Sequence, residues 1–524
     1  MAFEANKEMP QEVVEPRLED AVSAGAETRG WESTPLVGNL KSKTFSSALI
    51  TACSQAVQLV ITMGTTMVLA RKIAPEAFGL VAMVMVIFDF LRIFKDAGLS
   101  VATIQRESLS EAQISNLFWI NTAVGGGVSL LLLISAPFIA WFYREPILVP
   151  ITVALSGTFL LSGLAVQHLA LLKRQMDFKS VAKVQVTALL VSSGIGIGAA
   201  WWGAGLWSLV AMQVSQAVAV FILAWFSVDW RPSRPRRDSG TGSLVRFGAN
   251  VSLSSLIWSI ARGSDGLLIG RMYGAEAVGL YTRAGALLMR PLNQCLVPVN
   301  DVFVPVLSRL QSDPARYRST FLQAYECIAL GGFFGTGLVL ALAEPIVLVV
   351  LGTSWSQAIP VFAAFTIMTL YVPLHSTSSW LFSSQGRGSD WLRTAGIMSA
   401  LTVAGILVGL PFGARGVALS LAVSGLFLQT PVVFWVAGRK GPVHTKDLWR
   451  GYLRQAPVWF VVCGSTLLVK FALNSLAPLL QLLVAVPAGL LAGSAFVAIY
   501  PPAREVVANL WKAVGSWRGG MVKK

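Results

Sequence analysis

The chain has 524 residues, of which 54% are hydrophobic and 13% are charged, and its formal net charge at pH 7 is +15. Because ordinary soluble domains carry roughly 25% charged residues, this composition excludes a water-soluble protein. Beyond residue 45 the sequence consists of apolar blocks of about 20 residues, and each can cross a bilayer core of about 30 Å as a helix. The sequence therefore predicts an all-α polytopic membrane protein.

Residues 1–45 are polar and lack the apolar core and cleavage site of a signal peptide, so we expect a disordered cytoplasmic N-terminal tail. The apolar blocks that follow predict about 14 transmembrane helices. They begin near Ser46, Ala77, Ser115, Pro146, Ser180, Ala204, Val245, Ala277, Phe321, Ala358, Trp391, Ala414, Gln455 and Ala477. The loops between them are short and leave no room for a catalytic domain outside the membrane.

These spans divide the chain into segments. Spans 1–6 (46–228) form a predicted N-lobe and spans 7–12 (245–437) a predicted C-lobe. Residues 229–244 between them form an Arg/Pro-rich cytoplasmic linker, because prolines prevent a regular helix. Residues 438–500 contain a cytoplasmic loop and spans 13–14. The basic cytoplasmic tail, 501–524, has apolar residues at helical spacing, which fits either an interfacial helix on the inner leaflet or a solvated end.

An internal repeat relates the two lobes. Val68–Leu80 and Leu268–Leu280 lie 200 residues apart without a gap and are identical at five of thirteen positions. Each copy lies at the turn between the first and second helices of a six-helix set. The repeat predicts duplication of a six-span unit, with both copies in the same orientation around a central cavity.

Lys and Arg residues gather in alternate loops, among them Lys173, Arg174, Arg439 and Lys440. Basic loops are retained on the cytoplasmic side, and an even number of spans then places both termini in the cytoplasm. The net charge reflects this topology and an attraction to anionic lipid headgroups of the bilayer. No nucleic-acid partner is needed to explain it.

Charged side chains at membrane depth are rare and usually face a bundle interior or a wet cavity. In the second predicted span four of them share one helix face: Asp89, Arg92, Lys95 and Asp96. In the eighth span, equivalent to the second by the repeat, a polar stripe consists of Arg283, Arg290, Gln294 and Asp301. In the seventh span Arg262 and Asp265 are three residues apart and could form an ion pair.

Taken alone, each charged residue could belong to an internal ion pair, or it could lie near a helix end with its side chain extending to the membrane interface. Together the equivalent stripes would face each other and carry surplus positive charge, which predicts a cationic central cavity suited to phosphate. The candidate substrate contacts are Arg92, Lys95, Arg262, Arg283, Arg290 and Gln294. Asp89, Asp96 and Asp265 are candidates either for salt bridges or for binding a coupling proton or sodium ion.

No pattern in the sequence indicates catalysis or a metal site. The four cysteines lie in apolar blocks without paired spacing, and the three histidines are isolated. We therefore predict no catalytic residue, no metal and no cofactor, apart from H⁺ or Na⁺ coupling, and we predict that the chain is not an enzyme.

Two stretches carry a family resemblance: Asp96–Arg106 with Asn116–Asn121, and Asp265–Arg271 continuing through Gly279–Ala284 to Pro305–Gln311. There the chain resembles the polysaccharide transporters, which are Wzx-type oligosaccharide-lipid flippases of the multidrug/oligosaccharidyl-lipid/polysaccharide exporter superfamily. The resemblance is to the colanic-acid and exopolysaccharide branch. It implies two six-helix lobes in a V shape, plus two C-terminal helices, around a cavity lined by spans 1, 2, 7 and 8.

The resemblance also implies a function. The chain would move undecaprenyl-pyrophosphate-linked oligosaccharide repeat units to the periplasmic leaflet of the bacterial inner membrane by alternating access, for exopolysaccharide or lipopolysaccharide biosynthesis. Its partners would be this polyisoprenoid-pyrophosphate-linked glycan, the bilayer, and a polysaccharide polymerase with its export machinery.

Two alternatives remain open. A cation-coupled multidrug exporter of the same superfamily should have an acidic cavity with little basic surplus. A membrane polysaccharide polymerase or glycosyltransferase needs catalytic groups on a sizeable outer loop, whereas the outer segment around residues 344–357 is short.

Overall fold

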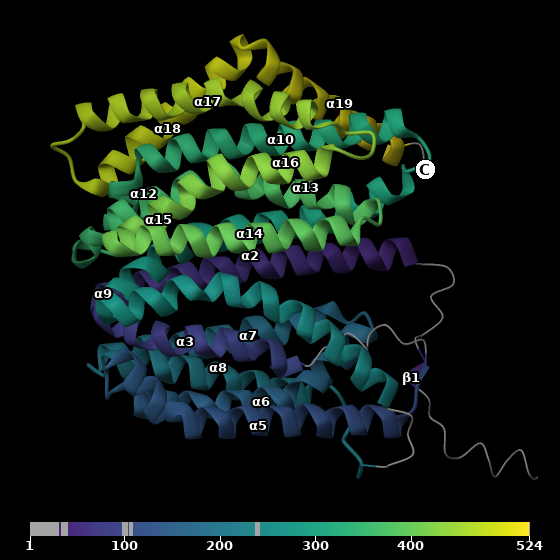
Figure 1. Cartoon of the computed structure of the whole chain (residues 1–524), viewed down its shortest axis with the longest axis vertical. Helices are drawn as coiled ribbons and strands as arrows, with labels where there is room; N and C mark the ends of the chain where they lie inside the picture. The colour runs from purple at the N-terminus through teal and green to yellow at the C-terminus, as the bar shows by residue number, and fades with distance from the viewer. Residues whose placement is uncertain (1–30, 33–39, 97–102, 104–107, 236–241, 523–524) are drawn as a thin grey trace, which may run out of the picture.

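The computed structural model describes residues 31–32, 40–96, 103, 108–235 and 242–522. Within these residues the helices lie roughly side by side, and the first begins at the end of the molecule where the C-terminus lies (Figure 1). We call this the termini end and the opposite one the closed end. The predicted all-α membrane fold is confirmed, apart from two short strands, β1 (Trp31–Glu32) and β2 (Ser108–Leu109), which pair antiparallel.

The first half of the chain contains six long helices, which correspond to the first six predicted spans. They are α2 (Leu40–Lys72), α3 (Pro75–Asp96), α5 (Glu111–Tyr143), α6 (Leu148–Arg174), α7 (Phe178–Trp201) and α8 (Leu206–Phe226). Side-chain caps fix helix starts at the termini end. The Ser110 hydroxyl accepts a hydrogen bond from the Gln113 backbone nitrogen at the start of α5 (3.2 Å), and Asp177 caps α7 in the same way.

The second half is less regular. Its elements are α9 (Gly242–Arg309), α10 (Pro314–Ala341), α11 (Ala343–Val350), η1 (Thr353–Ala358), α12 (Ile359–Met368), α13 (Val372–Ser384), α14 (Gly388–Gly409), η2 (Leu410–Phe412), α15 (Gly413–Ser424), η3 (Gly425–Gln429) and α16 (Thr430–Gly438). Predicted spans 7 and 8 both lie in α9, separated at Gly274, where φ is 80°. Span 10 is broken into α12 and α13, and span 12 contains the π-helical η3.

Three helices follow: α17 (Thr445–Ala472), α18 (Pro478–Ile499) and α19 (Pro501–Val522). Most predicted span starts lie within a few residues of a helix start. The largest difference is at α17, expected near Gln455, because hydropathy assigns its basic first turns, which include Arg450 and Arg454, to the preceding loop. Residues 236–241 of the predicted linker and most of the predicted N-terminal tail lie outside the described residues.

Ten segments of the described chain are long and apolar enough to cross a membrane. One of them, Gly388–Gly438, contains predicted spans 11 and 12. The remaining predicted spans correspond to α3 and to the two parts of α9. These are the spans to which the sequence analysis assigned the buried charge.

The two copies of the repeated motif pack against each other at the closed end. A Cβ atom on Gly79 would overlap the backbone carbonyl of Ala275, and a Cβ on Gly279 would overlap that of Pro75. Only glycine permits this approach, because every other residue carries a Cβ. Equivalent positions of the repeat thus bring α3 and the second part of α9 into backbone contact.

Side-chain contacts also join the two halves at the closed end. The Trp355 indole nitrogen donates to the Ala70 carbonyl (2.8 Å), and the Trp355 ring packs edge-on against Phe78, with centroids 5.3 Å apart. Arg71 donates to the Val349 carbonyl (2.6 Å). The segment between α10 and α12, which hydropathy treats as a loop, therefore binds the end of α2.

The repeat-equivalent arginine makes a reciprocal contact. Arg271, which corresponds to Arg71, lies over the Phe142 ring at the end of α5, 5.9 Å from its centroid. A Cβ on the neighbouring Gly270 would come within 2.7 Å of the Tyr143 ring. Each half therefore holds the other at the closed end through the same arginine position of the repeat.

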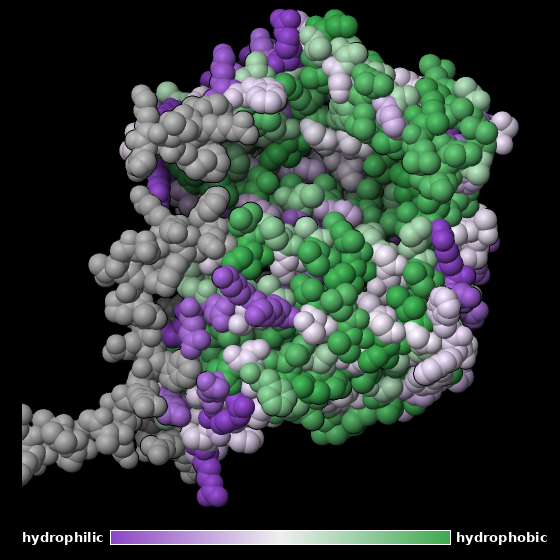
Figure 2. Space-filling view, turned by 180° about the vertical axis from the view of Figure 1, so that it is seen from behind, coloured by the Kyte–Doolittle hydropathy of each residue, from purple (hydrophilic) through white to green (hydrophobic). Residues whose placement is uncertain are grey.

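Buried apolar side chains show where the halves join and where they part. One cluster contains residues of both halves, such as Leu69 and Phe78 with Val278 and Trp355. Towards the termini end, the first half has a cluster of its own around Phe118, and the second half has a separate one with α17. The surface is hollowed between the two halves (Figure 2). The lobes thus form the predicted V, joined at the closed end.

The C-terminal helices dock on the second half. Arg318 of α10 binds both carboxylate oxygens of Asp447 at the start of α17, and Lys470 near its other end binds Glu344 at 2.7 Å. The predicted helix in the basic tail is present as α19. Its first turns pack on α10 and α17 through Ala503 and Val506, and its placement at a membrane interface stays a prediction.

We predict that Gly79→Ala weakens the closed end. The added methyl group would force α3 away from α9, and overpacking of this kind typically costs about 1–3 kcal/mol. The purified variant should therefore show a lower thermal unfolding midpoint than the unchanged chain. The matched control is Gly64→Ala in α2, where a Cβ meets no atom within 4 Å. Equal midpoints for the two variants would contradict the contact.

Candidate functional site

A central cavity of about 410 Å³ lies where α3 crosses both parts of α9. Asp89 and Phe90 line it from α3, Asp265 from the first part of α9, and Tyr281 from the second part. Phe365 of α12 completes the wall. Predicted spans 2, 7 and 8 therefore meet here as expected, and span 10 contributes where span 1 was expected.

Asp265 is held by two hydrogen bonds in this cavity. Its Oδ2 accepts from the Tyr281 hydroxyl at 2.8 Å and its Oδ1 from the Gly266 backbone nitrogen at 2.7 Å. The sequence analysis named Arg262 as a candidate partner, but the Arg262 side chain lies outside the described part of the chain. Tyr281 was missed because the kink at Gly274 brings it to Asp265, and helical spacing does not show such a contact.

Asp89 lies among positive charges. It forms an ion pair with Arg92 at 3.2 Å, in which both side chains are more than 60% exposed. Arg290, from the second part of α9, is within electrostatic range of Asp89. The stripes that the repeat makes equivalent therefore interact electrostatically, through one carboxylate of the first half and one guanidinium group of the second.

Arg92 also lines a second cavity, of about 280 Å³, inside the first half. The other polar residues on its walls come from α6 and α8. They are Thr158, Ser162, Gln213 and Gln216. The Asp89–Arg92 pair therefore lies at the boundary between the central cavity, which Asp89 lines, and this one, which Arg92 lines.

Arg283 lies nearer the closed end. Its guanidinium carbon is 4.7 Å from the centroid of the Phe78 ring, and Arg290 is within electrostatic range of it. Its Nε is buried and has no hydrogen-bond partner among the described residues. Arg283 thus connects the cationic stripe to the Phe78–Trp355 contact that joins the halves.

The structure gives fewer contacts for the remaining predicted site residues, Gln294, Lys95 and Asp96. Gln294 lies about one turn beyond Arg290, and its Oε1 is buried without a hydrogen-bond partner in the described part of the chain. Lys95 and Asp96 belong to the last turn of α3, but their side chains lie outside the described residues. Within the described residues, no three His, Cys, Asp or Glu side chains gather as a metal site would require.

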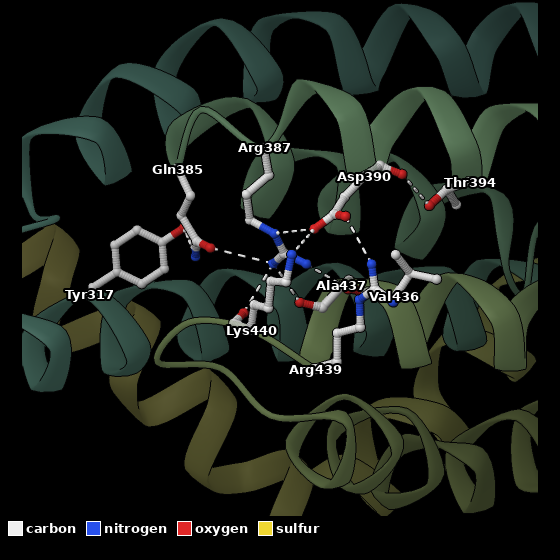
Figure 3. Close-up of polar contacts among 9 residues, drawn as sticks. All are labelled: Tyr317, Gln385, Arg387, Asp390, Thr394, Val436, Ala437, Arg439 and Lys440. Atoms are coloured by element: carbon white, nitrogen blue, oxygen red, sulfur yellow. Dashed lines mark hydrogen bonds and ion pairs between the residues drawn. The ribbon is translucent and has the colours of Figure 1, made fainter.

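The sequence analysis missed a charged cluster at the termini end of the second half (Figure 3). The Asp390 carboxylate, only 4% exposed, binds Arg387 at 3.2 Å, Arg439 at 2.8 Å and Lys440 at 3.3 Å. Arg387 also donates to backbone carbonyls at the end of α16, including that of Val436. The cluster fastens the start of α14 to the end of α16, which points to a structural role.

The arrangement between the halves suits an anion that carries several oxygen atoms. Arginine offers planar, bidentate donors that match phosphate, and it stays charged when partly buried. Arg92 and Arg290 come from opposite halves and both interact with Asp89, Arg92 by an ion pair and Arg290 electrostatically. Asp89 would hold these guanidinium groups in place when no anion is present.

Comparison with known proteins gives a family match over residues 68–360, to the family described as polysaccharide biosynthesis protein. The lipopolysaccharide biosynthesis protein WzxC of Escherichia coli is 23% identical over 439 residues, which cover 83% of this chain and 88% of WzxC. The succinoglycan biosynthesis transport protein ExoT of Rhizobium meliloti is 26% identical over 359 residues, covering 66% and 70%.

The teichuronic acid biosynthesis protein TuaB of Bacillus subtilis is 28% identical over 301 residues, or 57% of this chain, and the match spans 62% of the length of TuaB. Among solved structures, the lipid II flippase MurJ in an inward closed conformation aligns with a TM-score of 0.67 at 15% identity, covering 86% of this chain and 98% of MurJ. A multidrug transporter of the MATE family in an inward-facing conformation aligns with a TM-score of 0.56 at 13% identity, covering 74% and 97%. At such identities the likeness shows a shared fold.

Proposed function

Because the chain belongs to the family of polysaccharide biosynthesis proteins, we propose that this multi-pass membrane protein is a flippase for lipid-linked oligosaccharides. Its substrate would be an undecaprenyl-pyrophosphate-linked repeat unit, moved from the cytoplasmic to the periplasmic leaflet of the bacterial inner membrane for exopolysaccharide or lipopolysaccharide biosynthesis. The prediction that the chain is not an enzyme is confirmed by its relatives, one of which, ExoT, is named a transport protein.

The observation that carries the proposal is the pair of arginines contributed by opposite halves. Arg92 forms an ion pair with Asp89 at 3.2 Å, and the charge of the same carboxylate acts on Arg290. A pyrophosphate would replace the carboxylate as the partner of both guanidinium groups. Its binding would therefore act on the two halves together, as a substrate that drives alternating access must do.

The distribution of basic residues supports the orientation. With both termini in the cytoplasm, the termini end faces the cytoplasm and the closed end faces the periplasm. The hollow between the halves would then receive a substrate from the cytoplasmic leaflet. Release into the periplasmic leaflet requires the contacts of Trp355, Gly79 and Gly279 to separate while the termini end closes.

Asp265 is the described acidic residue best placed to couple transport to an ion. It lines the central cavity, and its two hydrogen bonds come from a hydroxyl and a backbone amide rather than from a cation. A proton or a sodium ion could therefore bind to it. Asp89, by contrast, forms an ion pair with Arg92, which favours the salt-bridge role.

The alternative within the same fold, a cation-coupled multidrug exporter, is supported less well. Lipophilic cations favour an acidic or aromatic cavity, and the described lining of the central cavity contains Asp89, Asp265 and aromatic rings but no arginine. The basic group nearest to it in the first half, Arg92, lines the neighbouring cavity. A polysaccharide polymerase or an export complex could receive the product on the periplasmic side, and we keep these as proposed partners. The named relatives in polysaccharide biosynthesis favour the glycan.

We predict that the double variant Arg92→Ala, Arg290→Ala loses surface polysaccharide in cells that depend on this gene. Each charge-assisted hydrogen bond contributes about 1.5–3 kcal/mol and about 1.4 kcal/mol corresponds to a tenfold change in binding, so export should fall by at least about tenfold. The control is Arg393→Ala, Arg415→Ala, which removes two exposed arginines elsewhere in the second half. Full export by the first variant, at equal amounts of protein in the membrane, would refute the two arginines as the pyrophosphate contacts.

We further predict that Asp265→Asn uncouples transport from its driving ion. The amide can still accept the hydrogen bond from Tyr281, but it cannot take up a proton or balance a sodium ion. In liposomes, translocation by the unchanged chain should accelerate under a proton or sodium gradient, whereas the variant should not respond. Asp301→Asn, at an exposed position of α9, serves as the control. A variant that still responds to the gradient would leave Asp265 with a structural role alone.

A further inference from the structure

The second half contains a cavity of its own, which we call the C-half cavity. It has a volume of about 440 Å³, within the range of small-molecule sites. It lies between α9, α13, α14 and the irregular helix that runs from α15 to α16, and it shares no lining residue with the central cavity. Among the residues that the structure describes, no Asp, Glu, Lys or Arg lines it.

The walls of the C-half cavity carry neutral hydrogen-bonding groups and aromatic rings. The polar groups include the amides of Asn300 and Gln429 and the imidazole of His375, and the rings are those of Tyr371 and Trp391. This combination suits an uncharged sugar. Sugar hydroxyl groups both donate and accept hydrogen bonds, as amides do, while the apolar face of a sugar ring packs on an aromatic ring.

The polar side chains are fixed by hydrogen bonds: Asn300 and His375 bond groups outside the cavity wall, and Gln429 bonds Thr402 within it. The Asn300 Oδ1 accepts from the Trp380 indole at 2.6 Å, which leaves its amide nitrogen to offer to a ligand. The His375 Nε2 bonds the Thr430 hydroxyl at 2.9 Å. Gln429 donates to Thr402 at 3.2 Å. Side chains that are already oriented lose little entropy when a ligand binds, which favours a binding site over an accidental void.

The backbone is irregular at the same place. The break between α12 and α13 puts Tyr371 on the wall, and the π-helical η3 ends at Gln429, also on the wall. Irregular backbone at membrane depth is tolerated where it is buried in protein or lines a wet cavity. Both π-helical turns and broken helices are frequent at binding sites of transporters.

The C-half cavity begins next to the proposed pyrophosphate site. Asn293, which lines it, is three residues from Arg290, a rise of about 4.5 Å along α9. Asn293 and Val297 are both exposed, so the cavity is accessible from the α9 side. A group attached directly to a pyrophosphate held by Arg290 would therefore reach it.

We propose that the C-half cavity is a subsite for an uncharged sugar, namely the residue attached to the pyrophosphate of the lipid-linked substrate. This inference rests on the proposed function and adds to it a site that selects the substrate by its first sugar. A lipophilic organic cation would favour carboxylate groups, and among the described residues of the cavity wall there are none.

The test measures binding to the purified protein in detergent. The probes are undecaprenyl pyrophosphate without sugar and the same lipid carrying a single glucose, galactose or N-acetylglucosamine. Dissociation constants follow from the rise of the thermal unfolding midpoint with probe concentration. Two or more additional hydrogen bonds should make the best sugar-bearing probe bind about tenfold tighter than the bare lipid.

Matched variants then test whether the preference for the sugar-bearing lipid depends on the C-half cavity. Ser399→Leu places a large side chain into the cavity and should abolish the preference for sugar, while binding of the bare lipid stays unchanged. Ala400→Leu, at the adjacent exposed position of α14, should keep the preference. Asn293→Leu should reduce the preference for sugar, and because Asn293 is exposed at the rim of the cavity, the variant should fold normally.

The outcomes separate the two proposals. If the unchanged chain binds the bare lipid but prefers no sugar-bearing probe, or if Ser399→Leu keeps the preference, the sugar subsite is wrong and the proposed function stands. If Ser399→Leu alters the response to sodium instead, the cavity is a cation site and the subsite is equally wrong. If the unchanged chain binds none of the four lipids, the proposed function itself fails.

Discussion

Backbone contact between Gly79 and Gly279 is the constraint on which the relation of the two halves depends. Because neither residue has a Cβ, α3 and the second part of α9 can approach until each meets the backbone of the other. The two glycines occupy the same position of the repeat, so the contact is reciprocal. Trp355 and Phe78 then seal the same end with aromatic rings. With the halves joined here, a hollow remains towards the termini end.

This contact also positions the charges. About three to four turns beyond the glycine contact, α3 carries Asp89 and Arg92, and α9 carries Arg290. Asp89 lines the central cavity. Arg283 lies between the glycine contact and this group and packs on Phe78. Binding of an anion at Arg290 would therefore be linked to the contacts at the closed end through adjacent turns of α9. In the proposed orientation, the closed end faces the periplasm.

Much of this could be predicted from the sequence, because hydropathy and the repeat report on regular helices. They predicted the span order and the pairing of spans 2 and 8, whereas the role of Arg92 and Arg290 stays a prediction. Contacts created by irregular backbone could not be predicted in this way. The kink at Gly274 brings Tyr281 to Asp265, and the π-helical η3 directs Gln429 into the C-half cavity. Asp390 was missed because two of its three partners, Arg439 and Lys440, are 49 and 50 residues away in the chain.

The most direct test of the account is the distance between spin labels placed on opposite halves at the closed end. Trp202 and Phe412 are 92% and 77% exposed there, and both would be changed to cysteine in a chain whose four native cysteines are replaced. Without substrate, one distance population should dominate. Addition of undecaprenyl pyrophosphate in a bilayer should create a second, longer one, as the closed end opens. A single unchanged distance in the presence of bound lipid would contradict the claim that pyrophosphate binding between the arginines opens the opposite end.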